Sequence, residues 1–335
     1  MNAGGNNNQF ITPRFDSGHD VFKGHRSMKK SKAYIGFIAP GFLLYTVFVV
    51  VPITFAMYYS LFEWNGIGPM KFVGLANFEK LLLGGRMSRI FFNALANNFQ
   101  YLASVLLVIT PIQILFAYLL FIKIRAHRYL QFTLFFPYVI STAIVGFFAT
   151  MVFDPNIGLL NTILERLGLD SLRSAWFGDP NLSFSLFVMV VIWACIGNGM
   201  MIFNANMKEI DNDILEAAVI DGCNERYKFF RIVLPQLYSS VSTVVTLGVI
   251  YALTMFDIPF MLGGVQGGVN NTIDFVNMVF YRYAFGGTYF GETSLGFGSS
   301  ISVTMFLIIL ICSLITKLFL QRGGRRDKAW KRKSY

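Results

Sequence analysis

Six long apolar runs dominate this sequence and limit what it can fold into. They are approximately Tyr34–Leu61, Leu95–Ile122, Leu130–Phe153, Phe184–Ala205, Ser239–Leu262 and Ser299–Leu320. A hydrocarbon core about 30 Å thick is crossed by roughly 20 helical residues, and each run is that long or nearly so. Because backbone amides in lipid must be hydrogen-bonded within their own segment, the runs are expected to be helices. The sequence therefore predicts an all-α, polytopic integral membrane protein with six transmembrane helices.

The composition excludes the main soluble alternatives. Hydrophobic residues make up 55% of the 335 residues and charged residues only 14%, which is more apolar surface than a soluble domain of this size can bury. The net charge of +10 lies in the tails and loops and shows no pattern typical of RNA binding. The sequence thus favours a membrane protein over a nucleic-acid-binding one.

The distribution of Lys and Arg predicts the orientation. If the N-terminus, the loop Lys123–Arg128, the segment 207–235 and the C-terminus share one side, that side carries 21 of the 28 basic residues. Basic residues accumulate on the cytoplasmic side, so both termini and the segment 207–235 are expected in the cytoplasm of a bacterial cell, at its inner or plasma membrane. Residues 1–32 are expected to form a disordered arm, residues 33–321 the membrane domain, and residues 322–335 a basic tail at lipid headgroups.

A polar hairpin interrupts the apolar pattern between the fourth and fifth runs. Its central part, Glu216 to Pro235, reads EAAVIDGCNERYKFFRIVLP. One of Asp211, Asn212 and Asp213 is expected to cap a first short helix, and Asn224 a second. Gly222 provides the backbone freedom for the turn, and Pro235 closes the unit. A compact helix with small residues between acidic ones is suited to insertion into a groove on another protein.

This hairpin resembles the EAA motif, the coupling loop of permease subunits in bacterial binding-protein-dependent ABC importers. The resemblance implies the type I, MetI-like permease fold and a coupling role for the motif positions. Glu216 would make the charged contact with a cytoplasmic ATPase, Ala217 and Ala218 would allow close approach, and Gly222 would set the angle between the helices. The full set of expected coupling residues is Glu216, Ala217, Ala218, Asp221, Gly222, Ile232, Leu234 and Pro235.

Further segments resemble the sugar permeases of the same family. They are IAPGFLLYTVFVVVPITFAMYYSLFEWNG (38–66), FVGLANFEKLL (72–82), FFPYVISTAIVGFFATMVFDPNIGLLN (135–161) and FDIPFMLGGVQGGVNNTI (256–273). The resemblance implies a permease for a mono- or oligosaccharide. It also implies four kinds of neighbour: a second permease subunit in a heterodimer, two cytoplasmic ABC ATPase subunits, an extracytoplasmic sugar-binding protein and membrane lipid.

Polar residues inside apolar runs are candidates for the substrate path, because they are costly in a membrane. They are Asn97, Asn98, Asn198, Tyr251, Thr254 and Asp257. For each of these residues a structural role is the alternative interpretation. Asn198, between two glycines, fits a helix-packing contact. Asp257, just before Pro259, fits the start of a broken helix.

No sequence motif for catalysis is present. The chain lacks the G-x-x-x-x-G-K-[ST] phosphate loop, a His-Glu metal motif and a nucleophile elbow, so it is predicted to be no enzyme and to need no cofactor or metal. ATP hydrolysis is expected on a separate chain. Two alternatives stay open. A cargo such as a glycerol phosphate would favour basic residues in the pore, and the runs contain essentially none before Lys317. An ion-coupled transporter would need membrane carboxylates, and only Asp257 is available.

Overall fold

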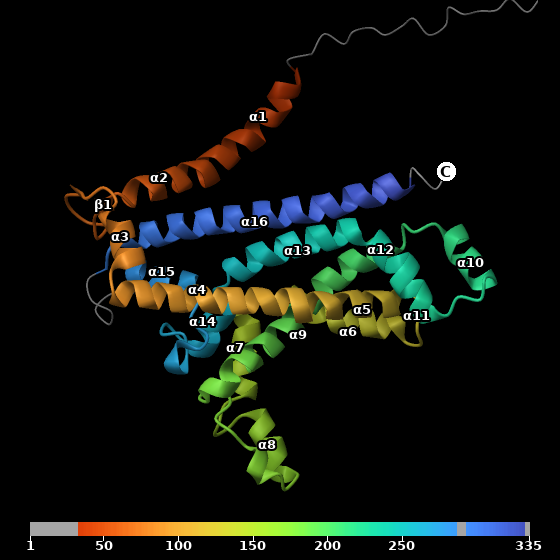
Figure 1. Ribbon diagram of the computed structural model, residues 1–335. Helices are drawn as coiled ribbons and strands as arrows, with labels where there is room; N and C mark the ends of the chain where they lie inside the picture. The colour runs from red at the N-terminus through yellow and green to blue at the C-terminus, as the bar shows by residue number, and fades with distance from the viewer. Residues whose placement is uncertain (1–32, 287–292, 332–335) are drawn as a thin grey trace, which may run out of the picture. The chain divides into compact units, whose positions relative to one another are not determined.

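The computed structural model describes residues 33–286 and 293–331 (Figure 1). The chain divides into two compact units, one ending at Pro52 and the other beginning at Ile53. The expected N-terminal arm, residues 1–32, lies outside the described residues, as do residues 332–335 of the expected basic tail. The described part of the first unit is helical, with α1 (Ala33–Tyr45), the π-helical turn η1 (Thr46–Val50) and the start of α2 (Val51–Tyr59).

The second unit is built almost entirely from helices. In order they are α3 (Ala76–Leu83), α4 (Arg86–Ser104), η2 (Val105–Ile109), α5 (Thr110–Phe121), α6 (His127–Val139), α7 (Thr142–Val152), α8 (Leu159–Arg166), η3 (Asp170–Leu172), α9 (Pro180–Met207), α10 (Asn212–Ile220), α11 (Glu225–Lys228), η4 (Phe229–Val233), α12 (Leu234–Gln236), α13 (Tyr238–Leu253), α14 (Asp257–Gly263), η5 (Val269–Asn271), α15 (Val276–Phe285) and α16 (Leu295–Lys331). The strands among the described residues, β1 (Phe62–Glu63) and β2 (Lys71–Phe72), form one antiparallel pair. The all-α prediction is confirmed.

Among the described residues, four helical stretches are long and apolar enough to cross a membrane, and six if each bent helix pair is one span. The four are Gly36–Tyr59, Arg86–Phe121, Pro180–Met207 and Leu295–Leu320. In the second unit, α4–α5, α13 and α16 run roughly side by side (Figure 1). The helix α16 also extends beyond the predicted end of the sixth run, to Lys331.

The third and fifth apolar runs are each divided into more than one helix. The third bends by 102° between α6 and α7, two residues after Val139. Pro137 lies inside α6, two residues before the helix ends. The fifth run ends its helix α13 at Leu253 and begins again at Asp257 as α14. The two second halves, α7 and α14, pack together, and Gly146 of α7 allows this approach: a Cβ there would lie 2.6 Å from the side chain of Met261.

Prolines explain where the helices of this protein widen into π-helical turns. The turns η1, η2 and η4 each end two residues before a proline, namely Pro52, Pro111 and Pro235. Proline lacks an N–H and clashes with the carbonyl four residues earlier, so a wider turn keeps the helix continuous without that contact. Pro111 thus follows a π-helical turn in the middle of the second span.

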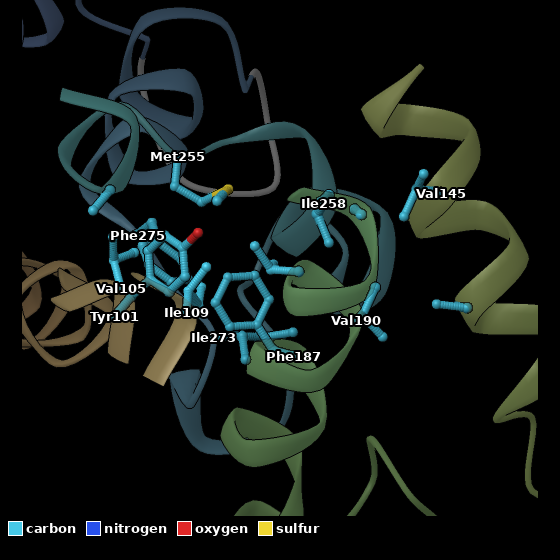
Figure 2. Close-up of a cluster of buried hydrophobic side chains, with 14 of the residues drawn as sticks. Tyr101, Val105, Ile109, Val145, Phe187, Val190, Met255, Ile258, Ile273 and Phe275 are labelled. Carbon is cyan, nitrogen blue, oxygen red and sulfur yellow. The ribbon is translucent and has the colours of Figure 1, made fainter. Parts of the chain in front are cut away.

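The buried core joins the spans of the second unit through aromatic rings (Figure 2). The ring centroid of Tyr101 on α4 lies 5.3 Å from that of Phe187 on α9. The ring centroid of Phe187 lies 5.2 Å from that of Phe275, which precedes α15. Each of these side chains is almost fully buried. A second apolar cluster joins α5, α9 and α13 to the hairpin that follows α9, through residues such as Met207, Ile210 and Val233.

Candidate functional site

The hairpin 207–235 adopts the local structure that its sequence predicts. The Asp211 carboxylate accepts the Asp213 N–H at 3.0 Å and caps α10, and Asn224 Oδ1 accepts the Tyr227 N–H at 2.8 Å and caps α11. Gly222 follows α10 with a φ of +76°, a backbone conformation that residues other than glycine rarely adopt. Gly222 and the Asn224 cap were identified from sequence, and Asp211 was one of three candidates for the first cap.

The helix α10 divides its residues between the body of the protein and the outside. Leu215 packs against the buried cluster of α5, α9 and α13, and Ala218 is also buried. Glu216, Ala217 and Asp221 are exposed. The two adjacent alanines thus differ, because Ala218 faces the protein while Ala217 faces away.

The exposed side of α10 is both apolar and charged. Val219 and Ile220 keep 59% and 86% of their surface exposed. Within the described residues, the Glu216 carboxylate has neither a salt bridge nor a hydrogen bond. A short rigid helix with exposed apolar side chains and an unused carboxylate has the chemistry of a docking surface.

The second half of the hairpin runs as a continuous helical path through α11, η4 and α12. Ile232 and Leu234 are half-buried, and Pro235 is exposed in the first turn of α12. Pro235 was expected to close the unit, but the path continues to Gln236. A bend of 68° then leads into α13.

A cavity of about 600 Å³ lies between the spans of the second unit. Its walls come from α4, η2, α5, α6, α7, α9 and α13. The lining residues are Tyr101, Val105, Ile109, Thr110, Gln113, Pro137, Tyr138, Ile140, Thr142, Val145, Ala194, Cys195, Asn198, Gly199, Ile202, Val244, Leu247, Gly248, Ile250, Tyr251 and Thr254. None of these side chains is charged at neutral pH, and the cavity combines apolar walls with several hydroxyl and amide groups.

Three residues predicted for the substrate path lie on this cavity. Asn198 is half-buried, and within the described residues its amide has no hydrogen-bond partner. The Tyr251 hydroxyl accepts a hydrogen bond from the Cys195 thiol at 3.7 Å, which leaves its own proton free to be donated. Thr254 donates to the carbonyl of Ile250 at 2.8 Å. Asn198 and Tyr251 therefore offer hydrogen-bonding capacity to a polar guest.

Gln113 is a cavity residue that the sequence interpretation missed. Its amide donates to the Cys195 carbonyl on α9 at 3.0 Å, and its other end lies against Gly199. A Cβ at Gly199 would lie 2.2 Å from Gln113 Oε1, so α5 and α9 meet closely at this point because residue 199 is glycine. The signal in the sequence was the same as for Asn198, a polar amide inside an apolar run.

The other three predicted path residues lie outside the cavity lining. Asn97 donates to the carbonyls of Asn271 and Asp274, at 3.0 and 2.8 Å. Asn98 is fully buried, donates to the Ala252 carbonyl at 2.8 Å and accepts the Val276 N–H at 3.1 Å. Both asparagines thus connect α4 to other segments, which is the structural alternative considered from sequence.

Asp257 begins α14 and is exposed beside the cavity. Its carboxylate accepts a hydrogen bond of 2.6 Å from Thr142, which lines the cavity at the start of α7. It therefore lies at the start of a broken helix, where its negative charge is favourable next to the unpaired N–H groups.

A buried ion pair fixes the loop between α14 and α15 and was not found from sequence. Arg282 donates two hydrogen bonds to Asp274, at 2.9 and 2.6 Å, and a third to the Val265 carbonyl at 2.8 Å. Burial raises the pKa of the Asp274 carboxyl, and the hydrogen bonds from Arg282 oppose that rise. Among the described residues, no cluster of three or more His, Cys, Asp or Glu side chains has an arrangement suited to a metal ion.

Residues 80–326 match the family described as "Binding-protein-dependent transport system inner membrane component". Among curated proteins, the chain is 30% identical to the probable ABC transporter permease protein YurN of Bacillus subtilis (strain 168), over 86% of this chain and 95% of YurN. It is also 30% identical to the arabinooligosaccharides transport system permease protein AraP of the same organism, over 86% of this chain and 88% of AraP.

The fold also matches a solved structure. The crystal structure of a bacterial ABC transporter involved in the import of the acidic polysaccharide alginate aligns with a TM-score of 0.74. The alignment covers 88% of this chain and 97% of that chain, at 20% sequence identity. That chain therefore shares the arrangement of helices seen here, and the predicted fold is confirmed.

Proposed function

The chain belongs to the family of inner-membrane components of binding-protein-dependent transport systems, and we propose that it forms part of the translocation pore of an ATP-driven importer for a mono- or oligosaccharide. In this proposal residues 33–321 are the permease domain, residues 207–235 its coupling loop and residues 322–335 a basic tail. The chain itself is a transport subunit and no enzyme, and ATP is hydrolysed on another polypeptide.

The observation that carries the coupling role is the exposed face of α10. Both helices of the hairpin are capped, and one side of the hairpin packs onto the spans. Glu216 and Val219 remain exposed on its other side. This is the arrangement needed to insert a rigid helix into a groove on a cytoplasmic ATPase. The wider assembly contains a second permease subunit, two ATPase subunits and an extracytoplasmic sugar-binding protein. ATP binding shifts it between outward and inward access.

The cavity supports an uncharged cargo. A sugar needs hydrogen-bonding groups beside an aromatic or apolar surface, and Asn198, Tyr251 and Tyr138 supply both. A phosphate-bearing cargo would require a positive charge, and no Lys or Arg lines the cavity. The names of similar proteins, such as the arabinooligosaccharides transport system permease protein AraP, support the same class of cargo.

The first experiment is a pull-down of the detergent-solubilised protein from native membranes, with the chains that co-purify identified by mass. The proposal expects an ATPase with a phosphate-loop motif and a second EAA-bearing permease. If the protein comes down alone from mild detergents, with no ATPase, the coupling role of the hairpin is wrong. Import that stops when the ion gradient is collapsed, while ATP is maintained, would favour the ion-coupled alternative.

Substitution of Glu216 by Lys tests the docking face directly. The reversed charge is expected to abolish most ATPase co-purification and sugar uptake, because the contact with the ATPase becomes repulsive. The change alters no hydrogen bond or ion pair among the described residues, so the permease itself is expected to keep its unfolding temperature. Normal co-purification and normal uptake by the Glu216→Lys variant would contradict the proposed contact.

A further inference from the structure

The hairpin is hydrogen-bonded to a span that does not flank it in the sequence. The Tyr118 hydroxyl, near the end of α5, donates to the Glu225 carboxylate in the first turn of α11, at 2.7 Å. We propose that Tyr118 is a positioning residue that fastens the coupling hairpin to the second span, so that movement of the hairpin is passed to the cavity. This inference rests on the coupling function proposed above.

Three side chains make up the fastening, which we call the Tyr118 latch: Tyr118, Glu225 and Lys228. The Lys228 ammonium donates to the other Glu225 oxygen at 2.6 Å, so both carboxylate oxygens are used. A carboxylate held on one side by Lys228 is fixed in direction and accepts the tyrosine proton as a charge-assisted hydrogen bond. The Lys228 side chain is only 12% exposed, which limits its exchange with water.

The tyrosine ring adds packing to the hydrogen bond. The Tyr118 ring lies 4.6 Å from the ring of Phe229, the residue that begins η4. Tyr118 itself is 7% exposed, so its hydroxyl reaches Glu225 from an otherwise buried position. Within the described residues, Tyr118 provides the hydrogen bonds between the hairpin 207–235 and a helix that is not adjacent to it in sequence.

The helix α5 connects the latch to the cavity. Gln113 lies five residues before Tyr118, about 7.5 Å along the helix axis. Gln113 lines the cavity and donates to the Cys195 carbonyl of α9. A helix transmits axial movement as a rigid rod, so a pull on Glu225 is passed through Tyr118 to Gln113. The contact between α5 and α9 would then change at the point where Asn198 lines the cavity.

The test compares sugar transported per ATP hydrolysed in proteoliposomes that contain the whole complex and its binding protein. Tyr118→Phe removes the hydroxyl and keeps the ring against Phe229, so the complex is expected to assemble and co-purify. The transported-to-hydrolysed ratio is expected to fall about fivefold, the lower end of typical coupling between two sites. Tyr129→Phe is the matched control and is expected to leave the ratio unchanged. Tyr129 is exposed, and its hydroxyl has no hydrogen bond among the described residues.

A double-mutant cycle separates the latch from a general packing effect. Glu225→Ala should lower the ratio, and adding Tyr118→Phe should change it no further, because the two substitutions remove one shared hydrogen bond. Glu225→Gln keeps an acceptor and should retain part of the coupling. Independent, multiplicative effects of Tyr118→Phe and Glu225→Ala would overturn the latch, as would a wild-type ratio for Tyr118→Phe.

The outcomes also distinguish this inference from the proposed function. If the wild-type complex hydrolyses ATP and imports sugar while Tyr118→Phe matches it, the latch is wrong and the importer stands. If the wild-type chain forms no complex with an ATPase, both the importer and the latch are overturned. If wild type and Tyr129→Phe give the same ratio of sugar transported to ATP hydrolysed and Tyr118→Phe gives a lower one, both the importer and the latch are supported.

Discussion

Two glycines of α9 let neighbouring helices approach it closely. Gly199 lets the side chain of Gln113 lie directly against α9, and Gly197 does the same for the backbone of α6, where a Cβ would lie 2.7 Å from the Leu134 carbonyl. The sequence IGNGM therefore packs helices with its two glycines and presents Asn198 between them to the cavity. The two glycines thus have a packing role in this motif, while the role of Asn198 in the substrate path stays a prediction.

Substitution of Gly199 by Ala is expected to destabilise the permease. The new methyl group displaces Gln113 and breaks its hydrogen bond to the Cys195 carbonyl, at a cost of about 1–3 kcal/mol. A lower thermal unfolding temperature of the detergent-solubilised protein would measure this. The double variant Gly199→Ala/Gln113→Ala removes the clash and should recover part of the loss. An unchanged unfolding temperature for the single variant would show that α5 and α9 are not in close contact here.

Asn198 lines the cavity, and we propose that it binds the cargo. Replacing it by Leu removes an amide that faces the cavity without a partner, so uptake at low sugar concentration should fall about tenfold, as expected for one lost hydrogen bond. The measurement is initial uptake, with ATPase co-purification as the check on assembly. Asn206→Ala is the control on the same helix, because that amide bonds to the Ile202 carbonyl of its own helix. Equal uptake by Asn198→Leu and wild type would remove Asn198 from the path.

The helices show which features of an element its own sequence determines. The caps of α10 and α11 and the turn at Gly222 follow from residues within a few positions of each other. Prolines lie where spans depart from ideal geometry, but the form of the departure differs. Pro111 is accommodated by a π-helical turn, whereas Pro137 precedes a bend of 102°. The difference depends on what packs around each helix.

Substitution of Pro111 by Ala is expected to convert η2 toward an ordinary α-helix. Loss of one π-helical residue changes the register by about 100° between the residues before and after the turn. Val105 should then leave the cavity wall. In a variant with Cys195, Cys223 and Cys312 replaced by Ala, a cysteine at position 105 should react more slowly with a small thiol reagent after Pro111→Ala.

A cysteine at position 107 provides the control for the Pro111 experiment. Leu107 lies on the same π-helical turn and is 76% exposed, away from the cavity lining. Its reactivity should change in the opposite direction or remain as before. If position 105 reacts at the same rate with and without Pro111, the π-helical turn does not depend on the proline.

The whole molecule presents large apolar surfaces, as a chain with lipid and protein neighbours must. Along α16 alone, Leu310, Ile311, Leu314 and Ile315 are exposed by 45–60%. Hydropathy identifies such a helix as a span but assigns the same value to a face that meets lipid and a face that meets another helix. The orientation of the spans, in contrast, is predicted from the charges in the loops.

The charge distribution predicts that both termini and the hairpin lie in the cytoplasm. In the variant with all three cysteines replaced, a cysteine at position 216 should react with a membrane-impermeant maleimide only after spheroplasts are permeabilised. A cysteine at position 157 should react in intact spheroplasts, because Ile157 is 85% exposed in the loop on the predicted outer side. The reverse pattern would invert the topology, and labelling of both positions in intact spheroplasts would contradict it.

The sequence by itself determined the class of this protein, its apolar spans and the hairpin between two of them. These features depend on solvation and on contacts within a few residues, so composition and spacing are sufficient to predict them. It also singled out six polar residues in apolar runs, of which Asn198, Tyr251 and Thr254 line the cavity.

The tertiary structure decided which polar groups share a cavity and which fasten helices together. The Asn98 amide donates to and accepts from residues more than 150 positions away in the chain. Tyr118 donates a hydrogen bond to Glu225, which is 107 residues away. Such pairings depend on how bent helices pack, and the break between α13 and α14 places Asp257 beside Thr142 rather than within a continuous span. Because the energy of a polar group in a membrane depends on the partner it finds, its role follows from packing between distant segments.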